Sequence, residues 1–179
     1  NASPSFTEGG SAVVLDNNVA VLDQELLRSN SYAGATLTLQ RQGGPSTQDV
    51  YSATGSLGSI SSASGNLVVG GTTIGTYTNS GGTLVFTFNA SATNTLVNQA
   101  MQQVAYSNSS DAPPASAQIN WTFSDANSGA QGSGGALQAT GSTTVTITAV
   151  NDAPVLDASG TMTLTTISED QTGNAGNTI

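Results

Sequence analysis

The sequence predicts an all-β fold, a β-sandwich with one short helix at about residues 94–104. Several segments alternate apolar residues with threonine or other polar residues, which is the period of a strand with one buried face. Turn-forming Gly, Asn and Ser residues separate these segments at short intervals. Only 7% of the residues are charged, which argues against a disordered polyelectrolyte, and 179 residues suffice for one large sandwich.

Strands are expected along most of the first half of the chain. Residues 35–40 give the clearest example, because Ala35, Leu37 and Leu39 alternate with polar residues and leave one face apolar. Residues 79–82, Asn-Ser-Gly-Gly, are expected to form a hairpin turn in which glycine supplies the positive φ angle. The strands expected in this half are 6–15 (with a bend at Glu8), 19–22 (ending at Asp23), 35–40, 49–53, 58–61, 67–69, 72–77 and 83–88.

The alternation stops between Asn94 and Val104, where the spacing of the apolar residues becomes helical. Apolar side chains recur there on one side and glutamines occupy the other, which predicts an amphipathic helix of about three turns. Thr93 or Asn94 is the expected N-cap. We expect this helix to close one open end of the sandwich, and a partner-binding helix is the alternative.

The second half of the chain returns to strands. A strand is expected to begin at Tyr106 and to end at 111–114, and residues 117–124 alternate with Trp121 on the apolar side. Trp121 is therefore expected to lie in the core, whereas a sugar-stacking role would require it to be exposed. A glycine-rich loop over 125–135 precedes the last strand, within 136–150. That strand is followed by Asn-Asp-Ala-Pro at 151–154. The first two side chains carry oxygens that could bind a hard cation, and the proline cannot extend a strand ladder, so the segment suits a junction between β-domains.

Missing residue types exclude several kinds of chemistry. The chain has no cysteine, histidine or lysine. Disulfides, thiolate or imidazole metal sites, His-based triads, Schiff bases and the phosphate-binding lysine of a P-loop are therefore impossible. A pair of carboxylates is the remaining machinery for catalysis, and no recognisable cleft motif pairs them. We therefore expect a protein that is not an enzyme.

The chain is strongly acidic, with a formal net charge of −9. This charge opposes binding to nucleic acid or to an anionic membrane surface. It is consistent with simple solubility of a secreted protein, and equally with acids that bound cations neutralise. No apolar run approaches the roughly 18 residues of a membrane span, so membrane insertion is not expected.

Five segments resemble, in order, the cadherin-like tandem repeats of giant bacterial surface and secreted (RTX-type) adhesins. They are Thr7–Gly10, Gly34–Leu39, Val104–Asp111, Ile119–Asp125 and the junction Val150–Val155. The resemblance implies an Ig/cadherin-like sandwich over residues 6–152. Residues 1–5 would then be a linker remnant, and residues 153–179 the incomplete start of a following repeat. We accordingly expect the chain to be a piece of a longer extracellular or cell-surface protein.

The same resemblance implies a junction ion, Ca²⁺, in the full-length protein. Matching by motif, its candidate ligands are Glu8, Asn151 and Asp152. Asp125 matches a Ser-Asp turn of the repeat, and Asp23 with Glu25 could stand for a mid-domain acidic pair. Because the full Asp-x-Asn-Asp-Asn linker is not present, one or two ions are expected rather than a larger cluster. The alternative is that these side chains cap turns through bonds to the backbone.

The expected function is therefore that of a spacer or cell-adhesion repeat whose junctions calcium stiffens. Its expected partners are neighbouring repeats of the same chain and a host or matrix glycan or protein. The alternative, from another class, is a β-sandwich that is itself a carbohydrate- or protein-binding module. Exposed aromatic side chains on one face would favour that alternative.

Overall fold

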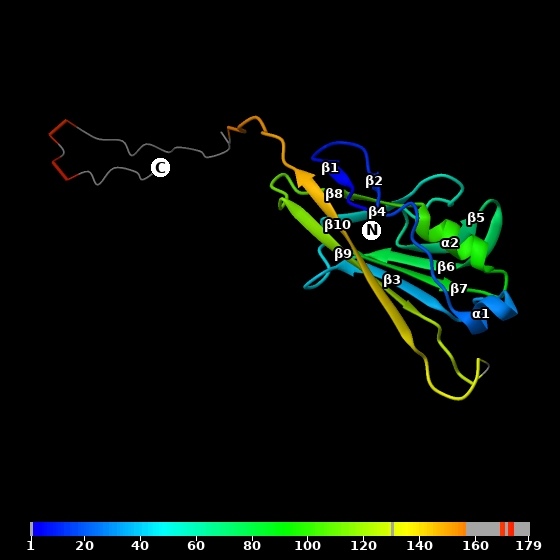
Figure 1. Cartoon of the computed structure of the whole chain (residues 1–179). Coiled ribbons are helices and arrows are strands. Elements are labelled where there is room, and N and C mark those ends of the chain that lie inside the picture. Colours follow the sequence, from blue (N-terminus) through cyan, green and yellow to red (C-terminus); the bar gives the residue numbers. More distant parts are fainter. Residues whose placement is uncertain (1, 130, 157–168, 171, 174–179) are drawn as a thin grey trace.

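The alternating segments form two β-sheets (Figure 1). The computed structural model describes residues 2–129, 131–156, 169–170 and 172–173. The seven-stranded sheet contains, in spatial order, β1 (Ser5–Thr7), β10 (Gln138–Thr148), β9 (Ser116–Ser124), β3 (Thr36–Arg41), β7 (Thr83–Phe88), β6 (Thr72–Ser80) and β5 (Ser64–Val69). The three-stranded sheet contains β2 (Val13–Val14), β8 (Val104–Asn108) and β4 (Asp49–Ala53). The predicted all-β sandwich is confirmed.

Strand β3 lies at the centre of the large sheet and shows why the alternation folds as it does. Leu37 and Leu39 are fully buried, and the alternating threonines Thr36 and Thr38 are half-buried on the other face. In the antiparallel register Leu37 lies opposite Phe86 of β7 and Phe123 of β9. Apolar side chains on one face of three adjacent strands therefore meet in one layer of the core.

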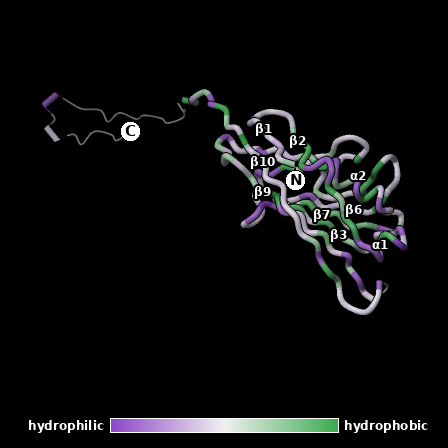
Figure 2. Tube along the Cα trace, viewed as in Figure 1, coloured by the Kyte–Doolittle hydropathy of each residue, from purple (hydrophilic) through white to green (hydrophobic). Residues whose placement is uncertain are grey.

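The core contains every aromatic residue of the chain. Tyr106 is fully buried and makes edge-to-face contacts with Phe6 (ring centroids 6.4 Å apart) and Tyr51 (6.2 Å). Hydrophobic residues recur along the strands of the body in Figure 2. The buried aromatic side chains, each no more than 5% exposed, are Phe6, Tyr32, Tyr51, Tyr77, Phe86, Phe88, Tyr106, Trp121 and Phe123.

The predicted helix is present as α2 (Asn94–Gln102). Thr93 is its N-cap, and the Thr93 hydroxyl accepts a hydrogen bond from the backbone N–H of Leu96. Val97, Ala100 and Met101 are buried in the core, as the apolar spacing indicates. The helix ends two residues earlier than predicted, because β8 begins at Val104.

A second helix, α1 (Gln24–Ser29), was not predicted. A strand was expected over 19–22, and the structure contains none there. Side-chain amides of α2 take the place of a strand partner: Asn98 accepts a hydrogen bond from Val21 N–H (3.0 Å), and Gln102 donates to the Val19 carbonyl (2.9 Å). Because these amides bond backbone N–H and carbonyl groups of residues 19–22, this segment does not need to pair with a neighbouring strand.

Two further boundaries differ from the expectation. The first predicted strand is split into β1 and β2 by a turn in which Gly10 N–H donates to the Thr7 carbonyl (2.8 Å). Residues 58–61 form no strand. Just before them the N–H of Leu57 donates to the Gln103 side chain (2.7 Å) at the end of α2, and Gly58 N–H donates to the Val68 carbonyl of β5 (2.8 Å). This backbone therefore makes isolated bonds to α2 and to β5 instead of a continuous strand pairing.

The chain leaves the body after β10 (Figure 1). Val155 and Leu156 are 93% and 90% exposed and do not join the core. Most of the predicted start of a following repeat, residues 153–179, lies outside the described residues. In the part of the chain that the structure describes, no helix is long and apolar enough to cross a membrane.

Candidate functional site

The predicted site residues fall mainly at the two ends of β10. Glu8 and Asp152 line a cleft where the chain leaves the body, which we call the exit cleft. Glu25 and Asp125 line a second cleft just before β10 begins, which we call the loop cleft. The eleven residues of β10, at about 3.4 Å per residue, separate the two clefts by roughly 35 Å. One ion cannot bind both groups.

The exit cleft is assembled by the parallel pairing of β1 with β10. Thr7 pairs with Thr148, so Glu8 lies beside the residues that follow β10. Its backbone N–H donates to the Thr148 carbonyl (3.0 Å), and its carboxylate accepts a hydrogen bond from Val150 N–H (2.8 Å). Glu8 thus holds the first residues of the junction against the body. The cleft has a volume of about 330 Å³ and is lined by Glu8, Gly9, Asn108, Ser109, Ser110, Asp111, Val150 and Asp152.

Asp111 is a third acid in the exit cleft that the sequence reasoning missed. It follows a turn in which Ser110 N–H donates to the Asn108 side chain (3.0 Å) and Ala112 N–H donates to the Ser110 hydroxyl (3.1 Å). Its position at the end of a predicted strand was the available signal. Asn151 does not line this cleft, and its amide donates to the backbone carbonyl of Asp152 (3.3 Å).

The exit cleft offers carboxylate and hydroxyl oxygens, which are the donors that Ca²⁺ and Mg²⁺ accept. Across residues 2–129, 131–156 and the four described positions beyond them, no three acids lie close enough together to hold an ion by themselves. A cation bound here would therefore need further oxygens, from water or from the segment that follows the junction.

The loop cleft is built by backbone bonds to one carboxylate. Asp125 is 8% exposed, and its side chain accepts hydrogen bonds from Leu137 N–H (2.8 Å) and Asn127 N–H (3.0 Å). Asp23 likewise caps α1 by accepting from Leu26 N–H (2.8 Å). Both acids make the backbone-capping bonds that are the alternative to metal binding. Glu25 lies in the first turn of α1.

Asp49, the most buried acid among the described residues, was not a predicted site residue. Its side chain is inaccessible to solvent, and it forms a bidentate ion pair with Arg41 through Nε (2.8 Å) and Nη2. The Tyr106 hydroxyl (2.6 Å) and the Asn108 amide (3.2 Å) also donate to it. Because Arg41 lies on β3 and Asp49 on β4, this cluster ties the two sheets together.

Hydrogen bonding and burial shift the pKa values in this cluster. The hydrogen bond to Asp49 raises the pKa of Arg41, so the guanidinium stays charged. Burial, and then the hydrogen bond to Asp49, raise the pKa of Tyr106 to about 12. Asn108 connects the cluster with the exit cleft, because its amide nitrogen donates to Asp49 while its oxygen accepts from Ser110 N–H in the cleft wall.

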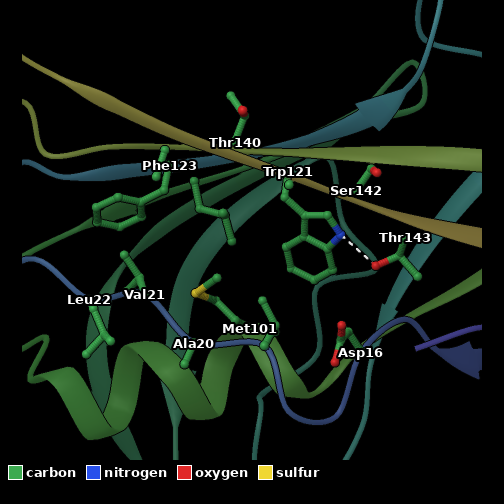
Figure 3. Close-up of a pocket in the computed structure, with 14 residues that line it drawn as sticks. Asp16, Ala20, Val21, Leu22, Met101, Trp121, Phe123, Thr140, Ser142 and Thr143 are labelled. Carbon is green, nitrogen blue, oxygen red and sulfur yellow. Dashed lines mark hydrogen bonds between the residues drawn. The ribbon is translucent and has the colours of Figure 1, made fainter. Parts of the chain in front are cut away.

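Trp121 lies in the core, as its alternation predicts, and not on a binding face. It is 5% exposed, and its indole N–H donates to the Thr143 hydroxyl (3.1 Å; Figure 3). Beside it a cavity of about 180 Å³ opens between β10 and residues 19–22, with Met101 and Phe123 also in its wall.

Comparison of the chain with protein-family models, with curated proteins and with solved structures finds no match.

Proposed function

We propose that this chain is a structural or adhesive repeat of a large extracellular bacterial protein, and that calcium stiffens the junction at its exit cleft. One observation carries the proposal. Glu8, Asp111 and Asp152 come from distant parts of the chain and line one cleft at the point where the chain leaves the sandwich. A cation held there would contact the body and the junction together.

The proposed mechanism is electrostatic. Without a cation the carboxylates of the exit cleft repel one another, and the junction beyond Val150, which Glu8 holds, stays mobile relative to the body. With Ca²⁺ bound, carboxylate oxygens on both sides of the junction share one ion, and the neighbouring repeat supplies the remaining oxygens. Binding to the folded state alone also raises stability, by about 2.7 kcal/mol when free calcium is a hundred times its Kd.

Thermal unfolding of the whole chain tests this proposal. We expect a higher midpoint with excess Ca²⁺ than with a chelator, and a smaller difference in the Asp152→Asn and Asp111→Asn variants. Glu25→Gln removes an acid from the loop cleft at the other end of β10, so it serves as the matched control. A midpoint that is the same with calcium and with chelator would contradict the calcium part of the proposal.

A carbohydrate-binding role is the second candidate, and one observation favours it. The outer face of the β9–β10 ribbon is hollowed and lined by amides and hydroxyls, including Gln118, Asn120, Thr122 and Ser142, which can bond sugar hydroxyls. The burial of all nine aromatic side chains weighs against it, because no ring is free to stack on a sugar. Screening against a glycan array separates the two roles, since a pure spacer binds none.

A further inference from the structure

Among the residues that the structure describes, strand β10 has a long edge without a partner. On one side it pairs with β9 over residues 138–146. On the other side β1 covers only Thr146–Thr148. Residues 138–145 therefore form an open edge of the seven-stranded sheet, visible in Figure 1 as the part of β10 that runs past β1.

The hydrogen bonds at the end of β10 show which residues present their backbone groups at this open edge. Thr146 N–H donates to Pro4 and the Thr148 carbonyl accepts from Glu8, both on the β1 side. Ile147 N–H donates to Ala115, on the β9 side. Since the direction alternates along a strand, the even-numbered residues face the open edge. Gln138, Thr140, Ser142 and Thr144 thus each offer one N–H and one carbonyl there.

The open edge lacks the features by which proteins protect such edges. Between Gln138 and Val145 there is no charged residue and no proline. At the opposite edge of the sheet, β5 has a register shift between Leu67 and Val68, and Leu57 bridges its last residue. The most exposed large apolar side chains of the body, Leu22 (77%) and Leu137 (73%), both flank the open edge of β10.

Both faces of the sheet are hollow beside the open edge. On the inner face, residues 139–143 line the cavity next to Trp121 (Figure 3). On the outer face, residues 140–142 line the hydroxyl-rich hollow described above. The open edge is therefore bordered by a hollow on each face of the sheet.

We propose that a second copy of this chain supplies that strand, through antiparallel pairing of the two open edges. In one register Gln138 lies opposite Thr144 and Thr140 opposite Ser142, in both directions. All four edge residues of each copy then exchange both of their backbone hydrogen bonds with the partner.

Other registers satisfy fewer groups. A shift by two residues in one direction brings Gln138 opposite Thr146, whose N–H is already bonded to Pro4. A shift by two in the other direction brings Thr144 opposite Ala136, which precedes the strand. A shift by one residue places each even-numbered residue, whose backbone groups point to the open edge, opposite an odd-numbered residue of the partner, whose backbone groups point toward its own β9. The register is therefore set by β1 at one end and by the start of β10 at the other.

The side chains agree with this register independently. Residues 143, 145 and 147 point into the core, so odd-numbered positions share the inner face. The pairing sets Leu137 opposite Val145 on that face, apolar against apolar. On the outer face it sets Gln138 opposite Thr144 and Thr140 opposite Ser142, all uncharged. Gly141 lies opposite Gly141 of the partner on the symmetry axis, and an isologous two-fold contact results.

This inference goes beyond the proposed function and does not depend on calcium. Two copies paired in this way run in opposite directions, since the strands are antiparallel. If the chain is one repeat of an array, such a contact joins arrays that approach from opposite sides, which is the geometry of adhesion between facing surfaces.

Single cysteines test the register, because the natural chain contains none. In Gly141→Cys the two new residues form a directly opposed, non-hydrogen-bonded pair with Cα atoms about 4.5 Å apart, within disulfide range. An added Cβ at Gly141 meets no atom within 4 Å, so the variant should fold. In Ala139→Cys the two cysteines are offset by four residues, or roughly 13 Å, and should not react with each other. We expect a disulfide-linked dimer from the first variant and several-fold less from the second.

Sedimentation velocity over a range of concentrations tests the association itself. We expect a monomer–dimer equilibrium, weakened about tenfold or more by Thr140→Pro, which removes an edge-directed N–H from each copy. Thr140→Val keeps that N–H and is the control. A chain that stays monomeric and yields no cross-link overturns the proposal. Equal cross-linking of both cysteine variants, or open-ended assemblies instead of dimers, also overturns it.

Discussion

Asp49 shows, at the scale of single residues, how a buried charge is made tolerable between two sheets. Its carboxylate receives bonds from Arg41, Tyr106 and Asn108, so its negative charge is both paired and hydrogen-bonded. Tyr51 lies beside Tyr106 but its hydroxyl, although buried, has no hydrogen-bond partner among the described residues. Two neighbouring tyrosines with almost the same burial therefore differ in what their hydroxyls contribute.

We predict that Tyr106→Phe and Tyr51→Phe have different effects on the free energy of unfolding. The first variant removes a buried hydrogen bond to a carboxylate, which should cost about 1.5–3 kcal/mol. The second removes a buried hydroxyl that makes no bond, so the cost should be close to zero or the variant slightly more stable. Urea unfolding of the two variants under the same conditions measures the difference. Equal losses would show that the Tyr106–Asp49 bond contributes nothing specific.

Stability should also fall at alkaline pH because of Tyr106. Burial raises its pKa to about 12 in the folded protein, whereas an unfolded tyrosine titrates near 10. Between these values the folded state keeps a proton that the unfolded state has lost, so stability decreases as pH rises. Below pH of about 10 the contribution is fully present. Urea midpoints measured from pH of about 8 to about 12 should fall less steeply in Tyr106→Phe than in the natural chain.

At the scale of elements, the turn between β6 and β7 contains two adjacent glycines with unequal requirements. Gly81 and Gly82 both have positive φ angles, +61° and +79°. A Cβ added at Gly81 meets nothing within 4 Å, whereas one added at Gly82 would lie 1.9 Å from the backbone oxygen of Ser46. The turn was predicted from its sequence, but the sequence does not show that the loop containing Ser46 packs closely against Gly82.

We predict that Gly82→Ala is much more destabilising than Gly81→Ala. Both variants place a side chain in the left-handed region, at a cost of about 1 kcal/mol. Gly82→Ala must in addition move the Ser46 backbone, which should bring its total above about 3 kcal/mol. Thermal unfolding of both variants checks this expectation, and similar midpoints would mean that the loop moves away freely.

The elements that the sequence predicts well are those in which periodicity and packing agree. Leu37 and Leu39 in β3, and Val97, Ala100 and Met101 in α2, are apolar at the positions that the core buries. Prediction failed where side chains replaced backbone pairing. Residues 19–22 have an apolar pattern typical of a strand, yet the amides of Asn98 and Gln102 hold their backbone. A contact between residues about 80 positions apart leaves no trace in local spacing.

At the scale of the whole molecule, the candidate site could be predicted only in part. Of the three residues matched by motif, Glu8 and Asp152 line one cleft and Asn151 does not, because Glu8 and Asp152 follow strands that the fold pairs in parallel. Whether they bind an ion stays a prediction. The motifs could not show that Glu25 and Asp125 line a different cleft, because the order of residues in the chain does not say at which end of a sheet a loop lies. Asp111 ends the resembling segment Val104–Asp111 but was not among the candidate ligands, and the fold brings it into the exit cleft.

The chain has only two basic residues, and we predict that they matter very differently for holding the two sheets together. Arg41 on β3 is paired with the inaccessible Asp49 on β4, whereas Arg28 lies exposed in the last turn of α1. Arg41→Met leaves a buried carboxylate without its counter-charge, which should cost about 3–5 kcal/mol, and Arg28→Met should change stability by about 0.5 kcal/mol or less.

The reason for the loss at Arg41 can be tested with a second substitution. In the Arg41→Met background, Asp49→Asn removes the uncompensated charge and should restore part of the lost stability, although the same change in the natural chain should be destabilising. Urea unfolding of the single and double variants gives the coupling between the two positions. Additive losses would mean that the ion pair between the sheets does not act as a unit, and that the sheets are held by apolar packing alone.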